Sequence, residues 1–187
     1  MDPEDDPLET SGAAERARFF AGRLLTPDLL RGEQTYHRGR LALALRALVG
    51  HGTVAGLRVT AADGSLHVAP GVAIDCLGRL IEVRTPLCLD LAGWTLPSAQ
   101  LLLHADATPT GEPAVRLTEG ARLELVPALE AATVPPPPLT PDAELEAVLD
   151  GWDPAPRAAG LLLARIAFGD VVTVDNTVRP FVRRSGR

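Results

Sequence analysis

The chain has 187 residues, a formal net charge of −6 at pH 7 and a hydrophobic fraction of 46%, which is enough to bury a core. Its 18 basic residues are all arginine and scattered, so we expect none of the phosphate neutralisation that nucleic-acid binding needs. The acidic start, the lack of a membrane-length apolar run and a cysteine count of two predict a soluble bacterial cytoplasmic protein with no membrane span.

The first part of the chain changes abruptly from polar to apolar. Residues 1–17 are acidic and show no periodic apolar pattern, which predicts a flexible tail. A compact apolar patch follows, and it contains two of the four phenylalanines of the chain: Phe19, Phe20, Leu24 and Leu25. Two interpretations stay open. The patch is a lid on the domain's own core, or it is a docking surface for a partner or a second copy.

A helix is predicted directly after this patch. Thr26 can cap it, Pro27 suits its first position, and Asp28 suits the positive end of the helix dipole. We expect the helix to run from Pro27 to about Val49 and to end at Gly50. Residues 18–50 therefore form the patch and a long amphipathic helix.

One side of this helix carries most of its apolar residues. At ~100° per residue, that side holds Leu30, Gln34, His37, Leu41, Leu45 and Leu48. We expect His37 to form a hydrogen bond where the helix meets the sheet. The predicted partner interface combines the patch with the first part of this side and Tyr36: Phe19, Phe20, Leu24, Leu25, Leu30, Gln34, Tyr36, His37 and Leu41.

Beyond Gly50 the apolar pattern has a period of two, with glycine at the corners. This indicates short antiparallel strands in a meander or small barrel over residues 51–182. The expected strands are 54–59, 66–68, 72–74, 80–83, 87–89, 101–105, 122–126, 160–168 and 171–174. Because the helix precedes the strands and does not alternate with them, we predict an α+β fold and no doubly wound parallel sheet.

Two further segments are predicted from composition. The proline-rich stretch 133–141 cannot continue a sheet, so we expect an extended surface segment, followed by a short helix at about 141–149. Residues 183–187 form a basic tail.

No residue pattern indicates catalysis, a cofactor or a metal. Cys76 with a histidine is the strongest candidate nucleophile, but the neighbouring Asp75 should raise the thiol pKa. The four histidines are spread over helix, loop and strands, and Cys76 and Cys88 lie too far apart in sequence for a typical zinc motif. A single disulfide between these two cysteines stays open. The chain is therefore predicted to be no enzyme.

Several stretches carry a family resemblance. The segment Arg18–Leu29, with Glu33–His37, resembles R-[FY]-F-x-G-x-L-L-T-x-x-D-[FL]-x-x-E-Q-x-Y. Two further stretches, Gly50–Val59 and Pro70–Arg79, are similar to hG-x-G-[VT]-V-x-G-L-x-V and P-G-x-A-[IL]-D-x-x-G-R, and the ending Asp175–Phe181 also matches. These patterns are similar to those of a bacterial family encoded with phage-tail-like contractile injection systems.

The resemblance implies a structural role at a baseplate or fibre attachment, with other subunits of a tail-like assembly as partners in a homo-oligomer or hetero-assembly. Arg23 departs from the family pattern, which has glutamine there, and Ala55 departs from a frequent cysteine. Two alternatives remain. The β domain is a stand-alone module that binds a ligand such as a glycan, or the chain is a hydrolase that uses Cys76.

Overall fold

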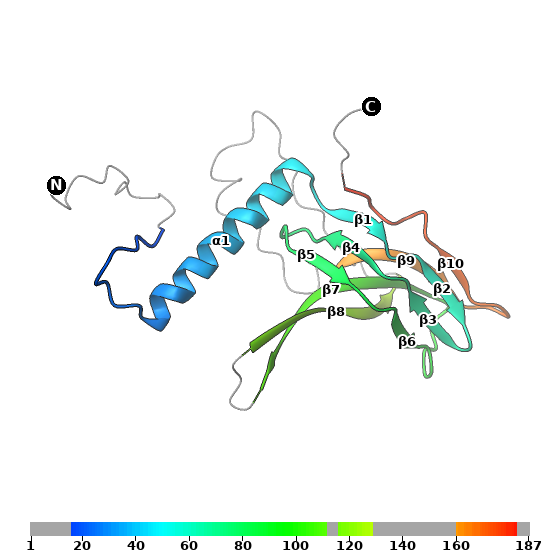
Figure 1. Ribbon diagram of the computed structural model, residues 1–187. Helices are drawn as coiled ribbons and strands as arrows, with labels where there is room; N and C mark the ends of the chain where they lie inside the picture. The colour runs from blue at the N-terminus through cyan, green and yellow to red at the C-terminus, as the bar shows by residue number, and fades with distance from the viewer. Residues whose placement is uncertain (1–15, 112–115, 129–159, 183–187) are drawn as a thin grey trace. The chain divides into compact units, whose positions relative to one another are not determined.

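The computed structural model describes residues 16–111, 116–128 and 160–182 (Figure 1). The expectations for the tail before residue 16, for the stretches 133–141 and 141–149, and for residues 183–187 lie outside these described residues. Contacts divide the chain into two units, residues 1–41 and 42–187. The helix α1, Pro27–Leu48, begins in the first unit and ends in the second.

The ends of α1 follow from local chemistry. The Thr26 side chain accepts a hydrogen bond from the backbone N–H of Leu29 at 3.2 Å, and this satisfies one of the unpaired donors of the first turn. At the other end, Gly50 adopts φ 74° and its N–H donates to the Leu45 carbonyl at 3.1 Å. The predicted start is confirmed, and the predicted end is correct to one residue.

In the described part of the chain, ten strands follow the helix. Their bounds are β1 Gly52–Gly56, β2 Val59–Ala62, β3 Ser65–Val68, β4 Gly71–Ile74, β5 Leu80–Val83, β6 Leu87–Asp90, β7 Ser98–Thr110, β8 Arg116–Pro127, β9 Leu161–Ala167 and β10 Thr173–Asp175. All paired strands are antiparallel among the described residues. The α+β class with antiparallel sheets is therefore confirmed, and a barrel-like closure stays a prediction.

The strands form three sheets around one core. Their orders are β1-β4-β5, β2-β3-β6 and β10-β9-β7-β8. Buried side chains from all three sheets meet in a single cluster, with Leu66, Ile81, Leu101 and Leu163 among its largest members. This shared core unites three small sheets that could not each bury a face alone.

The expectation of one strand over residues 54–59 is wrong. The strand breaks after Gly56, and its two halves, β1 and β2, belong to different sheets. Gly56 has φ 69° and Leu57 has φ 57°, so two successive residues adopt the left-handed conformation and the chain turns sharply. Leu57 remains fully buried in the core, and this packing opposes the strain of its backbone. An apolar alternation does not reveal such a bend.

The C-terminal segment Asp175–Phe181 ties this bend to the rest of the unit. The Asn176 side chain accepts from the Val59 N–H at 2.9 Å and donates to the Val59 carbonyl at 3.0 Å. The Arg179 guanidinium donates to the carbonyls of Gly56 and Leu57 at 3.0 and 2.6 Å. The same segment then forms a parallel bridge between Phe181 and Thr53. We call Asp175–Phe181 the strap.

A turn after β4 holds the last part of α1. The buried Asp75 carboxylate accepts from the backbone N–H groups of Leu77 and Arg79 at 3.0 and 2.8 Å, and from Arg79 Nε at 2.6 Å. Gly78 has φ 80°, and a Cβ added there would lie 2.1 Å from the Ala42 carbonyl oxygen. The helix backbone therefore rests directly on this glycine, and no larger residue fits.

Alanine substitutions at two glycines with similar backbone angles distinguish the effect of this close contact from that of backbone strain alone. Gly64 has φ 73° in the two-residue turn between β2 and β3, and no atom lies within 4 Å of an added Cβ. We expect Gly64→Ala to lower the free energy of unfolding by roughly 1 kcal/mol, because only the left-handed strain is added.

We expect Gly78→Ala to cost about 3 kcal/mol, since the methyl group also collides with the helix backbone. Urea unfolding of both variants beside the unmodified chain measures the difference. Equal losses for Gly64→Ala and Gly78→Ala would contradict the contact between this turn and α1.

Candidate functional site

The candidate site lies in the first unit, within the arm, which we define as residues 16–41. The arm contains the sequence-predicted interface residues and the larger part of α1. None of the 22 residues of α1 is buried. A helix in a protein gains most of its stability from packing an apolar face, and in α1 no side chain reaches full burial.

The apolar patch before the helix is open to solvent. Phe19, Phe20, Leu24 and Leu25 expose between 51% and 79% of their surface. Leu30 and Leu41, on the helix itself, are also exposed. Within the first unit, the patch is a continuous stretch of sequence with exposed apolar side chains.

Local contacts give the patch a defined conformation. The N–H of Arg23 donates to the Phe20 carbonyl at 3.2 Å, and Gly22 has φ 88°, so the chain makes a tight turn there. The Arg23 guanidinium lies 5.7 Å from the centre of the Phe20 ring and also donates to the Arg18 carbonyl. The arginine that departs from the family pattern thus supports the aromatic ring beside it.

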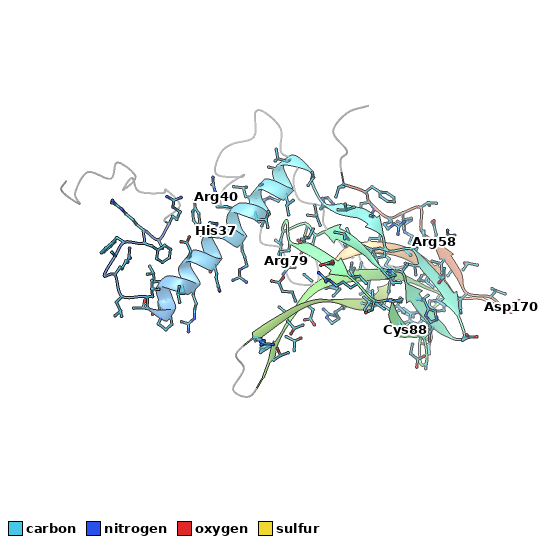
Figure 2. The ribbon with its side chains drawn as sticks, viewed as in Figure 1. His37, Arg40, Arg58, Arg79, Cys88 and Asp170 are labelled. Atoms are coloured by element: carbon cyan, nitrogen blue, oxygen red, sulfur yellow. The ribbon has the colours of Figure 1, made fainter. Side chains whose placement is uncertain are left out.

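The polar members of the predicted interface lie on the helix. His37 and Gln34 are exposed, and Tyr36 is half-buried with its ring edge-on to His37 at 5.4 Å. Nε2 of His37 lies 2.8 Å from Glu33 Oε1, one helical turn earlier (Figure 2). The expected bond of His37 to the sheet is therefore corrected, because its partner belongs to the same helix. Glu33 also accepts from the backbone N–H of Ala17 at 3.2 Å.

The alternative nucleophile, Cys76, is buried. Burial first and the neighbouring Asp75 second raise the pKa of its thiol to about 11. The thiol is therefore protonated at neutral pH, and a thiolate is needed for nucleophilic catalysis. Cys88 lies exposed on β6, and both cysteines are reduced, so no disulfide joins them.

A buried histidine in the β unit was not singled out by its sequence context. His104 on β7 places Nε2 3.0 Å from Oε2 of Glu124 on β8. Burial lowers the pKa of His104, Arg122 lowers it further, and Glu124 opposes them. A Cβ at Gly160 would lie 2.6 Å from the ring, so the imidazole is tightly enclosed. This arrangement indicates a packed, neutral side chain.

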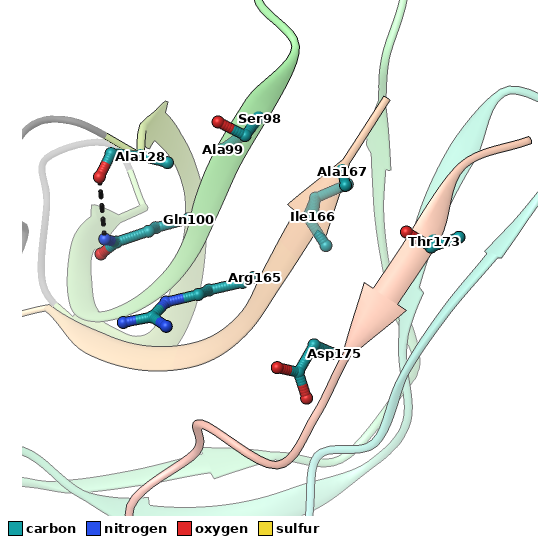
Figure 3. A pocket seen from close by; sticks show the side chains of 9 residues that line it. All are labelled: Ser98, Ala99, Gln100, Ala128, Arg165, Ile166, Ala167, Thr173 and Asp175. Carbon is teal, nitrogen blue, oxygen red and sulfur yellow. Dashed lines mark hydrogen bonds between the residues drawn. The ribbon is translucent and has the colours of Figure 1, made fainter. Parts of the chain in front are cut away.

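A pocket of about 400 Å³ opens beside β7, β9 and β10 (Figure 3). Its polar side chains include Gln100, Arg165 and Asp175, and Arg165 and Asp175 are partners in the β9–β10 register. Two hydrogen bonds from Thr177 lower the pKa of Asp175, so this carboxylate is ionised. No sequence pattern indicates this pocket, because its residues come from strands far apart in the chain.

Other classes of site receive no support from the described residues. Within residues 16–111, 116–128 and 160–182, no group of three or more histidines, cysteines or carboxylates is placed to hold a metal ion. In the same part of the chain, no helix is both long and apolar enough to cross a bilayer.

The buried cysteine gives the β unit a pH-dependent stability. The folded thiol pKa of about 11 lies above the ordinary value of 9.0, so between these two values the unfolded chain has released a proton that the folded chain retains. Stability from this group is complete below pH 9 and is lost as the pH rises toward 11. We expect the unfolding free energy of the unmodified chain to fall more steeply over this window than that of Cys76→Ala. Parallel slopes in urea unfolding at both ends of the window would contradict the raised pKa.

Comparison with known proteins adds no family to this description. No protein-family model matches the chain, and no curated protein matches it significantly.

Proposed function

We propose that the chain is a non-enzymatic structural subunit of a phage-tail-like contractile injection system, at the baseplate or fibre attachment. The exposed apolar arm carries this proposal. Its partners are other subunits of the assembly or further copies of this chain, and it uses no cofactor. Assembly takes place in the bacterial cytoplasm.

The energetic case rests on the apolar patch. Burial of apolar surface contributes about 25 cal/mol per Å², so two phenylalanines and two leucines contribute several kcal/mol before the cost of association. Aromatic side chains that enter a partner's pocket are frequent anchors of protein interfaces. Contact with a neighbour also buries surface of α1, none of whose residues is buried in the isolated chain.

The motif residues support a structural role by what they contact. Asp75, Gly78 and Arg79 form the turn under α1, while Asn176 and Arg179 bind the backbone of the bend. The remaining motif residues include the exposed patch. The residues that carry the family resemblance are therefore of two kinds. Some hold the β unit together, and others are exposed on the arm, where a partner can contact them. The choice of a contractile particle over another assembly rests on the resemblance alone.

Removal of the two aromatic rings tests whether the arm is the interface with other subunits. We expect Phe19→Ala/Phe20→Ala to reduce incorporation into particles by about tenfold or more, because both anchors lose their apolar area. The measurement is the amount of this chain that sediments with sheath and tube proteins from cells carrying the variant.

Val171→Ala is the matched control, since Val171 is 75% exposed but lies in the β unit. It should sediment as the unmodified chain does. Undiminished sedimentation of the double variant, with circular dichroism showing α1 intact, would remove the arm as the interface.

The pocket at Arg165 favours a second candidate, a β-domain module that binds a polar ligand such as a glycan. Arg165, Asp175 and Gln100 offer the planar donors and acceptors that hydroxyl groups need. Under this alternative, the chain is a monomer in light scattering and binds a sugar on a glycan array. Arg165→Ala would then abolish binding and Arg116→Ala would not. Absence of any ligand on the array counts against this candidate.

A further inference from the structure

The helix α1 carries a row of side chains that are spaced alternately four and three residues apart. Its members are Leu30, Gln34, His37, Leu41, Ala44 and Leu48. At ~100° per residue, these positions fall within about 80° of the helix surface. A spacing that averages about 3.5 residues is the repeat of a coiled-coil interface. We call these six residues the seam.

Every residue of the seam is exposed, although half of them are leucine. The exposed fraction is 46% for Leu30, 57% for Leu41 and 78% for Leu48. A straight row of exposed leucines with this spacing is typical of a helix that packs against another helix.

Other sides of α1 are partly covered by the chain itself. Leu29, Tyr36 and Leu43 form a second row at intervals of seven residues, and each is half-buried. The turn at Gly78 meets the helix at Ala42, which lies about 120° from the centre of the seam. The contacts among the described residues therefore leave the seam open to a partner.

Charged residues beside the seam favour a second copy in a parallel orientation. Glu33 lies on one flank of the seam, and the exposed Arg38 lies on the other flank, five residues later. In a parallel pair of helices in register, these two positions face each other, so each Glu33 meets the Arg38 of the other copy. A carboxylate oxygen can accept two hydrogen bonds, so the bonds of Glu33 to Ala17 and His37 do not exclude this contact.

The same charges oppose an antiparallel pair. When two antiparallel helices overlap along the whole seam, equal flanks meet, so Arg38 faces Arg38 and Arg40 faces Arg40. Gln34 would then face Ala44, which has no polar side-chain group. The parallel pair instead places two Gln34 amides opposite each other, and each amide both donates and accepts.

We propose that the seam pairs with the seam of a second copy, as a parallel coiled coil of two α1 helices in register. This inference rests on the proposed function, and it names one partner of the arm as another copy of the same chain. The aromatic patch then remains for different subunits. Because only half of the paired layers are leucine, free chains pair weakly, and neighbouring subunits that hold two copies together strengthen the contact.

Cysteine cross-linking in the full chain tests the pairing. Gln34→Cys and Ala44→Cys are each made together with Cys88→Ser, because Cys88 is exposed and Cys76 is buried. On mild oxidation, each variant by itself should form a disulfide-linked dimer, since equal positions face each other in a parallel pair.

Thr35→Cys in the same background is the matched control. Thr35 is exposed on α1 but lies outside the seam, so we expect about fivefold less cross-linked dimer. Cross-linking that appears only in a mixture of the Gln34→Cys and Ala44→Cys chains would show an antiparallel pair and overturn the proposal. Absence of cross-linking in all of these samples would also overturn it and leave the seam to a different subunit.

Charge reversal tests the register without an added cysteine. Arg38→Glu and Glu33→Arg each replace two attractive pairs by two repulsive ones, so each variant alone should self-associate about tenfold more weakly in sedimentation equilibrium. A mixture of the two variants restores both attractive pairs and should recover most of the affinity.

Arg116→Glu, in the β unit, is the control for the change in net charge, and it should associate as the unmodified chain does. A mixture that associates as weakly as the separate variants would contradict the parallel register.

The result is separable from the particle test. Phe19→Ala/Phe20→Ala should keep the cross-link at Ala44→Cys while it lowers sedimentation with particles. Particle binding by the unmodified chain, without cross-linking through the seam, would reject this inference and leave the proposed function standing. Cross-linking without any particle binding would remove the proposed function and leave the pairing of the helices.

Discussion

The β unit depends on the bond between Arg179 and the carbonyls of Gly56 and Leu57. At this point the chain leaves one sheet and enters another, so the carbonyls of the bend leave the regular ladder that would pair them. The Leu57 carbonyl is partly buried, and full burial of a carbonyl without a partner costs on the order of 1–3 kcal/mol. The strap supplies the donors from the far end of the chain, and Asn176 adds two bonds to Val59. The two ends of the β unit therefore fold together.

The two units contrast in how they are stabilised. The β unit has a shared core and a strap that joins segments more than 100 residues apart in sequence. The contacts described within the arm include a capped helix start, a turn at Gly22 and short-range pairs such as Asp28 with Arg31. Such contacts hold a conformation without burying apolar surface. The stability of the β unit therefore depends on long-range contacts, whereas the conformation of the arm depends on short-range ones.

Three polar residues of the described β unit are held in place by packing and hydrogen bonds. The Asp75 carboxylate accepts hydrogen bonds from three N–H groups of one turn. Burial keeps the thiol of the adjacent Cys76 protonated. His104 is enclosed between Glu124 and Gly160. Each group is fixed by packing, and none projects into the pocket near Arg165.

The sequence by itself determined the local features. The limits of α1, the turn at Asp63–Gly64 and most of the short strands follow from caps, glycine and alternation, because these signals act within a few residues. It also marked the apolar patch, although not its exposure. Only the tertiary structure decided the split at Leu57, the strap, and the pocket, since each joins residues remote in sequence. Sequence analysis also missed the outer halves of β7 and β8. These parts show no apolar alternation, and they extend as strands because β7 and β8 pair with each other.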